Sequence, residues 1–448
     1  MTPQSAFMVL APIDPRREAE LERLLVSMNG APGHARADNA LVPFGRFEQV
    51  HVARFLIVDD KTVSDNGAHG IPTPCYPRGL AFLGEVDGEA EAFLADVSAG
   101  ASEGLRAIFA CCDGFGAETH LLDWLLAHQV SAAAAYTNWR GRTVRRVRED
   151  AALRAVLERH VDRLAPQLEH LEPRAVHERL RALVLEDATA GRIALSAEAP
   201  TPLRWTLANL LHLASLPAAV VSVLVALFVV LSRAPRVALP AVAMALAAVV
   251  LRLRHLEKTD PELCAPPAPA EVTALATIED HDVTNQFSAM GSLKPGPLRL
   301  GTTVLVLWAI NWAARHLYTR GRLARVRSIH FARWVFLDRR RRVLFISNYD
   351  GSVESYMDDF INKVGFGLNV VFSNGIGYPR TRWLLADGCG DERKFKDYLR
   401  RHQMPTQVWY KAYPGLTAVD LERNARLRRG IDVTSMSARD AAAWVALL

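Results

Sequence analysis

Residues 329–360 read IHFARWVFLDRRRRVLFISNYDGSVESYMDDF, which predicts a strand, a basic turn, a second strand, an Asp-Gly corner and a helix. The chain contains this pattern twice. Residues 50–55 read VHVARF, like the IHFARW start, and residues 80–97 align without a gap to the last 18 residues of the stretch. A further block, residues 113–136, aligns in the same way to residues 387–410. Three blocks repeated in the same order indicate an internal duplication.

The elements around the first copy predict its architecture. Apolar strands at 7–13, 50–59 and 80–86 are interspersed with helices at 16–28 and after residue 89, and a last strand is expected at 132–139. This order is that of a ferredoxin-like unit. We therefore predict an α+β fold in which two internally duplicated ferredoxin-like units face each other as a barrel-like pair, with a transmembrane helical hairpin inserted between them.

Composition divides the chain into six segments. They are a first ferredoxin-like unit at 1–148, an amphipathic helical arm at 149–203, the transmembrane hairpin at 204–256, a linker at 257–272, a second ferredoxin-like unit at 273–430 and a C-terminal tail at 431–448. The arm has Leu and Val at helical spacing among Arg and Glu, so we expect a lateral helical layer, a partner-binding helix or a helix on the membrane surface.

The hairpin is predicted from two apolar runs. Residues 205–231 contain no Asp, Glu, Lys or Arg, and residues 237–251 form a second uncharged run. The first run exceeds the roughly 20 residues that a helix needs to cross a bilayer. The alternatives are one span with a re-entrant piece, or a buried hairpin in a soluble protein. Two spans place both units in one compartment, and the flanking Arg segments favour the cytoplasm, although Arg233 and Arg236 in the turn oppose it.

A third apolar segment, residues 301–317, bears on the topology because a third span would separate the two units. It carries Trp308 and Trp312 one helical turn apart. We expect a packed or interfacial helix rather than a span, since a series of arginines follows at once: Arg315, Arg320, Arg322, Arg325 and Arg327.

The net charge of +5 is concentrated in Arg-rich residues 140–148 and 315–342. These clusters are interpreted as solvated basic faces or as sites of attraction to anionic lipid. No nucleic-acid partner is expected, because no aromatic-studded basic strand accompanies them. The predicted partners are the lipid bilayer and a hydrophobic small molecule, with a homo-oligomer as a further candidate.

Strand alternation gives the first candidate site residues. Successive side chains of a strand point to opposite faces, so either His51 and His330 or Arg54 and Arg333 are expected to face the space between two sheets. A His or Arg at a strand start can also satisfy a helix end or a carboxylate. The alternative is a ligand-binding His, because imidazole suits a transition metal or haem iron.

Asp-Gly pairs at 87–88 and 350–351 precede helices in both copies. Gly permits a sharp corner, and an Asp or the following Ser352 can cap exposed amides. The second copy has Asn348 and Tyr349 where the first has Glu85 and Val86. A functional difference between the copies is therefore expected at these positions.

The duplicated arrangement resembles the dimeric α+β-barrel superfamily, which includes dye-decolorising peroxidases and chlorite dismutases. Residues 84–88 (GEVDG) match the Gly-x-x-Asp-Gly signature of the peroxidases, whereas the second copy has Ser347 in place of the first Gly. The resemblance implies haem, with Asp87 as the distal acid and His330 as the proximal metal ligand. A distal acid could move a proton between the oxygens of bound peroxide.

Two functions are therefore predicted. The first is a membrane-anchored haem-dependent peroxidase or oxygenase-like protein that acts on a hydrophobic small molecule. Its catalytic candidates are Asp87, Arg333 and Arg54, and its cofactor-binding candidates are His330, His51, Asn348 and Tyr349. The alternative is a non-catalytic membrane-associated protein that binds a lipid-like ligand or serves as a scaffold.

Overall fold

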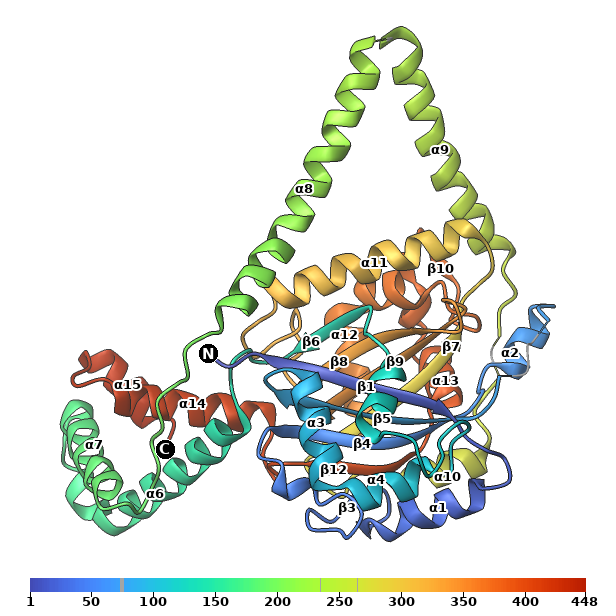
Figure 1. The fold of residues 1–448 in the computed structure, drawn as a ribbon. Coiled ribbons are helices and arrows are strands. Elements are labelled where there is room, and N and C mark those ends of the chain that lie inside the picture. Colours follow the sequence, from blue (N-terminus) through green and yellow to red (C-terminus); the bar gives the residue numbers. More distant parts are fainter. Residues whose placement is uncertain (73–75, 234, 264) are drawn as a thin grey trace.

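The computed structural model describes the chain except for residues 73–75, 234 and 264. It is an α+β protein in which two main β-sheets pack together, helices cover their outer faces, and a long helical hairpin projects from one side (Figure 1). A small two-stranded sheet, β10 (Thr381–Arg382) with β11 (Ala386–Asp387), lies near the base of the hairpin.

The first main sheet has the order β1-β5-β4-β12-β3-β2, and all its neighbours are antiparallel except β12 and β3. Its strands are β1 (Gln4–Pro12), β2 (Asn29–Ala31), β3 (His34–Ala35), β4 (Val50–Val58), β5 (Gly79–Asp87) and β12 (Thr406–Lys411). The second sheet is antiparallel with the order β6-β8-β9-β7. Its strands are β6 (Ala134–Thr137), β7 (Thr284–Ser292), β8 (Ile329–Leu337) and β9 (Arg342–Asp350).

Each sheet contains one strand from the other half of the chain. β6 precedes the hairpin but pairs with β8, and β12 comes late in the chain but pairs with β4. The segment predicted as a first unit, residues 1–148, therefore contributes its last strand to the sheet of the second segment. The two halves are held together by backbone hydrogen bonds as well as by side chains.

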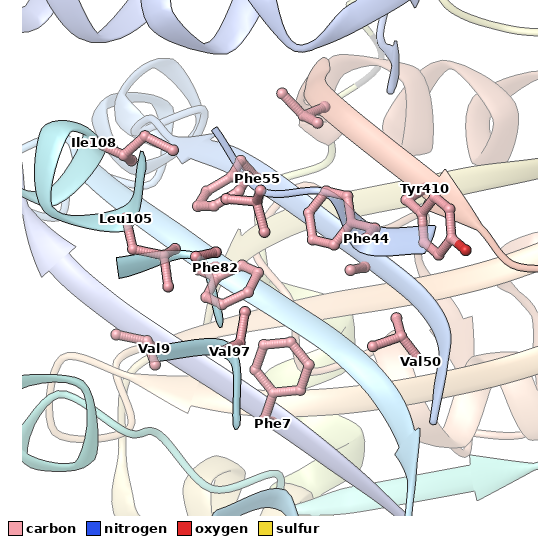
Figure 2. Close-up of a cluster of buried hydrophobic side chains, with 14 of the residues drawn as sticks. Phe7, Val9, Phe44, Val50, Phe55, Phe82, Val97, Leu105, Ile108 and Tyr410 are labelled. Carbon is pink, nitrogen blue, oxygen red and sulfur yellow. The ribbon is translucent and has the colours of Figure 1, made fainter. Parts of the chain in front are cut away.

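The core of the first sheet lies under α1 (Glu18–Ser27), α3 (Ala90–Gly100), α4 (Ser102–Phe109) and α5 (Leu121–Ala127), with the short helices η1 (Phe44–Arg46) and α2 (Val63–Ala68) in the connections. Aromatic rings dominate this core (Figure 2). Phe55 stacks on Phe82 with ring centroids 4.6 Å apart, and Phe44 stacks on Tyr410 of β12 at 5.2 Å. The buried Tyr410 ring thus anchors β12 in the first sheet.

A second apolar layer fills the space between the two sheets. Because side chains alternate along a strand, Phe7 and Val9 face the helices while Met8 faces the opposite sheet. The inter-sheet layer is completed by buried residues of both sheets: Leu56, Val58, Ala81, Leu83, Met290, Val335, Leu337, Leu344, Ile346 and Met404. The interior of the sheet pair is therefore packed with side chains.

The outer face of the second sheet is covered by α11 (Pro297–His316), α12 (Val353–Phe372) and α13 (Glu392–His402), with the short η2 (Gly388–Gly390) beside them. α11 lies across the base of the hairpin (Figure 1) and is tied to both legs. Trp312 Nε1 donates to the Leu213 carbonyl oxygen at 3.1 Å, and Arg299 pairs with Asp260 just after the second leg. The expectation over 301–317 is a packed or interfacial helix, and these contacts pack α11 against the bases of both hairpin helices.

The hairpin consists of α8 (Leu203–Arg233) and α9 (Pro235–Thr259), two helices long and apolar enough to cross a membrane. None of the most apolar 18-residue window of α8 is buried within the protein, and only 6% of that of α9 is. A core helix of a soluble protein would bury such a window. The linker after α9 contains α10 (Pro269–Ala276).

The predicted arm and tail form a separate helical cluster. α6 (Val144–Leu168) and α7 (Pro173–Thr189) pack with α14 (Ala418–Asp432) and α15 (Ala438–Val445), so the tail at 431–448 contains a helix. Leu157, Leu180, Leu427 and Trp444 are buried where these helices meet. Of the three expectations for the arm, the lateral helical layer is the one that these contacts match.

Candidate functional site

Arg54 of β4 reaches from the first sheet into the second. Its Nη1 lies 3.2 Å from the Phe287 carbonyl oxygen and 2.9 Å from Ser288 Oγ. Its Nη2 lies 3.1 Å from the Ser347 carbonyl oxygen and also donates to Asn348 Oδ1. All four acceptors belong to β7 and β9, so Arg54 links the two sheets through a fully buried guanidinium.

Arg333 of β8 makes the reciprocal contacts. It donates to the carbonyl oxygens of Phe7 at 2.7 Å and Gly84 at 3.3 Å, and it pairs with the Glu85 carboxylate at 3.2 Å. Glu85 and Asn348 occupy equivalent positions of the repeat, so each arginine meets the residue at this position in the other copy. The sequence difference between the copies at this position therefore has a structural meaning. Arg333 has a charged partner, Glu85, whereas Arg54 has a neutral one, Asn348.

This asymmetry leaves one carboxylate for two buried guanidinium groups. Burial first, and then the charge of Arg333, lower the pKa of Arg54 to about 9. Burial also lowers the pKa of Arg333, against the opposing charge of Glu85. Both side chains are held between the sheets by protein acceptors, which gives them a role in joining the sheets.

The two histidines form equivalent His–Asp pairs. His51 Nε2 lies 3.0 Å from Asp87 Oδ1, and His330 Nε2 lies 2.6 Å from Asp350 Oδ1. The second oxygen of each aspartate accepts a helix-terminal amide: Asp87 from Val144 of α6 at 2.8 Å, and Asp350 from Ala418 of α14 at 2.7 Å. Each aspartate therefore caps a helix far along the chain, while Ser352 caps the helix that follows the Asp-Gly corner, α12.

Both histidines lie at β-bulges. The register of β4 shifts between Val50 and Val52, and that of β8 shifts between Ile329 and Phe331. A bulge adds one residue and interrupts the alternation of side chains. The His51 ring lies 5.4 Å from that of Phe331 in the other sheet, so His51 and Arg54 both contact the facing sheet. In the first copy, therefore, the histidine and the arginine do not lie on opposite faces as strict alternation would place them.

Replacement of Asp350 by Asn is expected to lower the free energy of unfolding at pH 7 by about 1.5–3 kcal/mol, the range for hydrogen bonds to charged groups. Burial opposes ionisation of Asp350, but the charge and hydrogen bond of His330, with the Ala418 amide, hold its pKa below the ordinary value of 3.8. A depressed folded-state pKa contributes stability that is present above the unfolded pKa and is lost as the pH falls through the folded value.

The difference between the wild type and Asp350→Asn should therefore shrink as the pH falls below about 4. Denaturant unfolding followed by tryptophan fluorescence at pH 7 and pH 3 measures it. Asp113→Asn, at an exposed Asp-Gly position, is the control and should change stability little at either pH. A difference for Asp350→Asn that is equal at both pH values would contradict the assignment.

The predicted haem residues do not fit that group. His330 Nε2 is taken by Asp350, Asp87 is shared between His51 and α6, and both arginines are used between the sheets. Among the described residues, none of these side chains lines a cavity that could hold a macrocycle. No step through haem is derived for this chain.

Metal ligation at His330 has no supporting group either, because the described part of the chain holds no cluster of three His, Cys, Asp or Glu side chains suited to a metal ion. Tyr349, predicted to bind the cofactor, lies in the core on the helix-covered face of the second sheet. Its ring stacks on Tyr356 with centroids 3.9 Å apart. Burial raises the pKa of the Tyr349 hydroxyl, so it stays protonated.

The main apolar cavity lies elsewhere, between the second sheet, α11 and α12. Its volume is about 380 Å³, within the range of about 300–1,000 Å³ typical of small-molecule sites. The sheet supplies Phe287, Trp334 and Phe345, and α11 supplies Ala309 and Ala313. α12 supplies Phe360, Val364, Phe366, Leu368 and Val371. A smaller cavity of about 40 Å³ shares Trp334 and Phe345 and extends toward His402.

The cavity opens at the surface between α11 and α12. Ala309 and Phe366 line it and are both exposed, Phe366 to 67%. α12 is kinked beside this opening, because Val364 has φ −143° and ψ 26°, outside the helical range. Gly365 and Gly367 flank Phe366, and glycine weakens a helix at such a point. The kink places the Phe366 ring at the cavity mouth.

Trp334 contributes a polar atom to an otherwise apolar wall. Its side chain is 5% exposed, and its indole Nε1 is buried without a hydrogen-bond partner in the described part of the chain. A buried donor left unpaired costs free energy. A ligand with an acceptor atom could satisfy this N–H, so the cavity suits a mainly hydrophobic molecule with one such atom.

The sequence did not identify these cavity residues as a site. In the sequence Trp334 is only one residue of a repeated strand start, and the helix expected after the Asp-Gly corner ends at residue 360. The Gly-Phe-Gly triplet at 365–367 within an apolar helix was the available signal, because paired glycines in a helix mark a kink or a close approach.

Comparison of the chain with protein-family models, with curated proteins and with solved structures gave no match. Its function is therefore inferred from the geometry of its own residues.

Proposed function

We propose that this chain is an integral membrane protein whose α+β part binds a hydrophobic, lipid-like small molecule in the cavity between α11, α12 and the second sheet. The observation that carries the proposal is the apolar cavity of about 380 Å³ directly beneath the helix that joins both legs of the hairpin. Binding is the function proposed, without a chemical step.

The lining favours a hydrophobic ligand. Aromatic and aliphatic side chains surround the cavity, and transfer of apolar surface from water contributes roughly 25 cal/mol per Å². The Trp334 indole N–H supports a ligand that carries one acceptor, such as an ester or carboxyl oxygen. A wholly polar metabolite would leave its own groups without partners in this cavity.

The position of α11 supports entry from the membrane. Its C-terminal half is tied to α8 through Trp312 and through Arg315, whose Nε lies 2.9 Å from Asn209 Oδ1. Its N-terminal end is tied to the end of α9 by Arg299 and Asp260. If α8 and α9 cross the bilayer, α11 lies along the membrane surface, and the cavity mouth at Ala309 and Phe366 lies at the same level.

We also propose that both sheets lie on the cytoplasmic side. The two legs of the hairpin return the chain to the side it left, and exposed Arg320, Arg322, Arg325 and Arg327 follow α11 directly. An excess of arginine beside membrane segments is typical of cytoplasmic loops.

The finer fold that we propose is a duplicated ferredoxin-like unit whose two copies have exchanged their last strands. Three equivalences support it: the cross-sheet arginines, the His–Asp pairs and the capped helices α6 and α14. In an unexchanged unit the last strand would lie beside the first strand of the same copy. In this chain each last strand instead pairs with the second strand of the other copy, so β6 lies beside β8 and β12 beside β4.

A photoreactive fatty acid tests the binding proposal. Membranes that contain the protein are incubated with a diazirine-labelled fatty acid and irradiated, and the labelled peptides are identified by mass spectrometry. We expect labelling of residues 306–313 and 360–372 around the cavity in addition to the hairpin. Ala309→Trp, which places a large ring at the mouth, should reduce the labelling of α12 at least about tenfold, a loss of 1.4 kcal/mol or more in binding.

The hairpin provides an internal control, because its labelling by lipid-dissolved probe should be unchanged in Ala309→Trp. Leu305→Trp is the matched variant, since Leu305 is exposed on the same helix but does not line the cavity. It should leave the labelling of α12 unaltered. Labelling confined to residues 205–251 in the wild type would rule out the proposed site.

A further inference from the structure

A second, basic cavity lies where α8 leaves the α+β part. Its volume is about 730 Å³, and it is bounded by the end of β6, the start of α8 and the end of α11. Its walls include Trp139, Arg140, Trp205, Asn209, Arg315 and Arg320. No Asp or Glu side chain lines it among the described residues. The cavity is therefore positively charged, unlike the apolar cavity under α11.

Arg140 and Arg315 lack a carboxylate partner within ion-pairing distance among the described residues. The Nε atom of Arg140 is buried without a hydrogen-bond partner, while Nε of Arg315 is held by Asn209. Burial, and then the charge of Arg315, lower the pKa of Arg140 to about 10, so it remains charged at neutral pH. Two like charges in one cavity repel each other, and a bound anion would offset that repulsion.

Nearby carboxylates are engaged or lie outside this cavity. Glu422 pairs with Arg142 at 3.1 Å and with Arg429 at 3.3 Å, and Glu85 pairs with Arg333. The exposed Glu89 lines a neighbouring cavity of about 360 Å³ that also contains Arg140 and Arg315, but it does not pair with either. Arg140 and Arg315 are therefore cavity cations to which no carboxylate of the described residues is paired, whereas Arg429 of the same cavity pairs with Glu422.

The cavity lies where the apolar surface of α8 begins. Trp205 lines it, and the exposed apolar side chains of α8 continue from Leu207 and Leu210. The Arg315 guanidinium lies 5.9 Å from the centroid of the Trp205 ring. Tryptophan is enriched at the headgroup level of membranes, and basic pockets beside spanning helices bind acidic lipid headgroups.

We infer that Arg140 and Arg315 bind the phosphate group of an anionic phospholipid, whose acyl chains lie along α8 in the bilayer. Trp205 packs beside the headgroup, and Asn209 orients Arg315 toward it. The inference rests on insertion of the hairpin, which is part of the proposed function, but not on a ligand in the apolar cavity.

Lipid retention measured by native mass spectrometry tests this site. Detergent-purified protein is incubated with equal amounts of dioleoylphosphatidylglycerol and dioleoylphosphatidylcholine, and the bound lipids are counted. The wild type should retain phosphatidylglycerol preferentially, because the choline cation of the other lipid is repelled by the arginines. Arg140→Gln combined with Arg315→Gln should reduce the retained phosphatidylglycerol at least about tenfold.

Arg322→Gln combined with Arg325→Gln is the matched control, because it removes the same charge from exposed positions outside the cavity and should retain the lipid. Asn209→Asp is a second test that deletes no cation: its carboxylate beside Arg315 should compete with phosphate and reduce retention. Equal retention of the two lipids by the wild type, or undiminished retention by the Arg140/Arg315 variant, would overturn the site.

The source of the phosphate is tested separately with inorganic phosphate at constant ionic strength. We expect it neither to displace phosphatidylglycerol nor to raise the thermal midpoint of the protein. A midpoint raised by inorganic phosphate, with no lipid preference, would overturn the lipid assignment. Fatty-acid labelling of α12 is an independent readout, so failure of this site and failure of the apolar cavity are distinguishable.

Discussion

Replacement of Arg333 by Met is expected to lower the free energy of unfolding by about 3–5 kcal/mol, the cost of leaving a buried charge without its partner. Glu85 is 5% exposed, and Arg333 is its ion-pair partner within the described residues. The substitution keeps an apolar stem of similar length but removes the guanidinium that the carboxylate and the Phe7 and Gly84 carbonyl oxygens bind. The second sheet also loses this anchor on the first.

Arg54→Met is the matched substitution on the facing strand, and it should cost less. It leaves only neutral acceptors without their donor, whereas Arg333→Met also leaves a buried carboxylate, and it removes a desolvated cation that has no carboxylate partner among the described residues. Denaturant unfolding in detergent, followed by tryptophan fluorescence, measures both variants. Equal losses for Arg54→Met and Arg333→Met would contradict the asymmetry.

Asn348→Asp gives a sharper control. Asn348 Oδ1 accepts from Arg54 and, at 3.3 Å, from Trp409 Nε1, so an isosteric carboxylate keeps both acceptor contacts and pairs with Arg54. In the Asn348→Asp background, Arg54→Met should lower the free energy of unfolding as much as Arg333→Met does, because it leaves the new carboxylate at position 348 buried without its cation. If Arg54→Met lowers the free energy of unfolding by the same amount in this background as in the wild type, then a carboxylate at position 348 does not determine the loss.

Local patterns in the sequence located most strands within a few residues. The strand predicted at 50–59 is β4 (Val50–Val58), and that at 80–86 is β5 (Gly79–Asp87). Period-2 alternation reports which face of a strand is buried. It does not report which strand lies alongside, so the pairing of β6 with β8 and of β12 with β4 could not be read from it.

The site residues show the same limit. The His-x-Ala-Arg repeat draws attention to Arg54 and Arg333 as catalytic candidates, whereas in the structure they join the two sheets. The β-bulges at His51 and His330 shift the register by a single residue, and no signal in the composition marks them. Asp87 and Asp350 were expected to act near their own corners, whereas each caps a helix that the chain reaches much later, at Val144 and Ala418. Contacts of this kind depend on tertiary packing.

The apolar cavity depends on tertiary packing even more strongly. Phe345 and Trp334 alternate as ordinary sheet residues, and Ala309 reads as a good helix former. The cavity lies where small residues of α11 and the bend of α12 at Val364 leave space above the sheet. A cavity forms where the side chains of several elements do not fill the space between them. The sequence of any one element therefore does not predict it.

Replacement of residues 216–249 by a Gly/Ser linker is expected to move the protein almost completely from the membrane fraction to the soluble fraction. The removed segment contains most of the exposed large apolar side chains of both α8 and α9, whose insertion drives membrane association in the proposed function. The retained ends keep Leu213 against α11 and Glu257, which accepts from the Leu384 amide at 2.7 Å. The remainder of the fold should therefore persist.

The linker must join the retained ends of α8 and α9, two helices that are held near opposite ends of α11, a helix of 20 residues and thus roughly 30 Å long. About 30 flexible residues have a root-mean-square span of roughly 30 Å, so a linker of this length joins the ends without strain. Fractionation in alkaline carbonate measures the outcome: the wild type should stay in the pellet and the linker variant in the supernatant. A circular dichroism spectrum that retains the strand signal confirms that the soluble variant is folded.

Shuffling residues 216–231 at constant composition separates membrane insertion from specific packing. Because spanning depends on length and hydropathy, the shuffled chain should remain in the pellet. Release of the wild type by carbonate would mean that the hairpin does not cross the bilayer. Release of only the shuffled chain would instead mean that α8 is held by particular contacts along that segment, and α11 would then have to be placed away from the membrane surface.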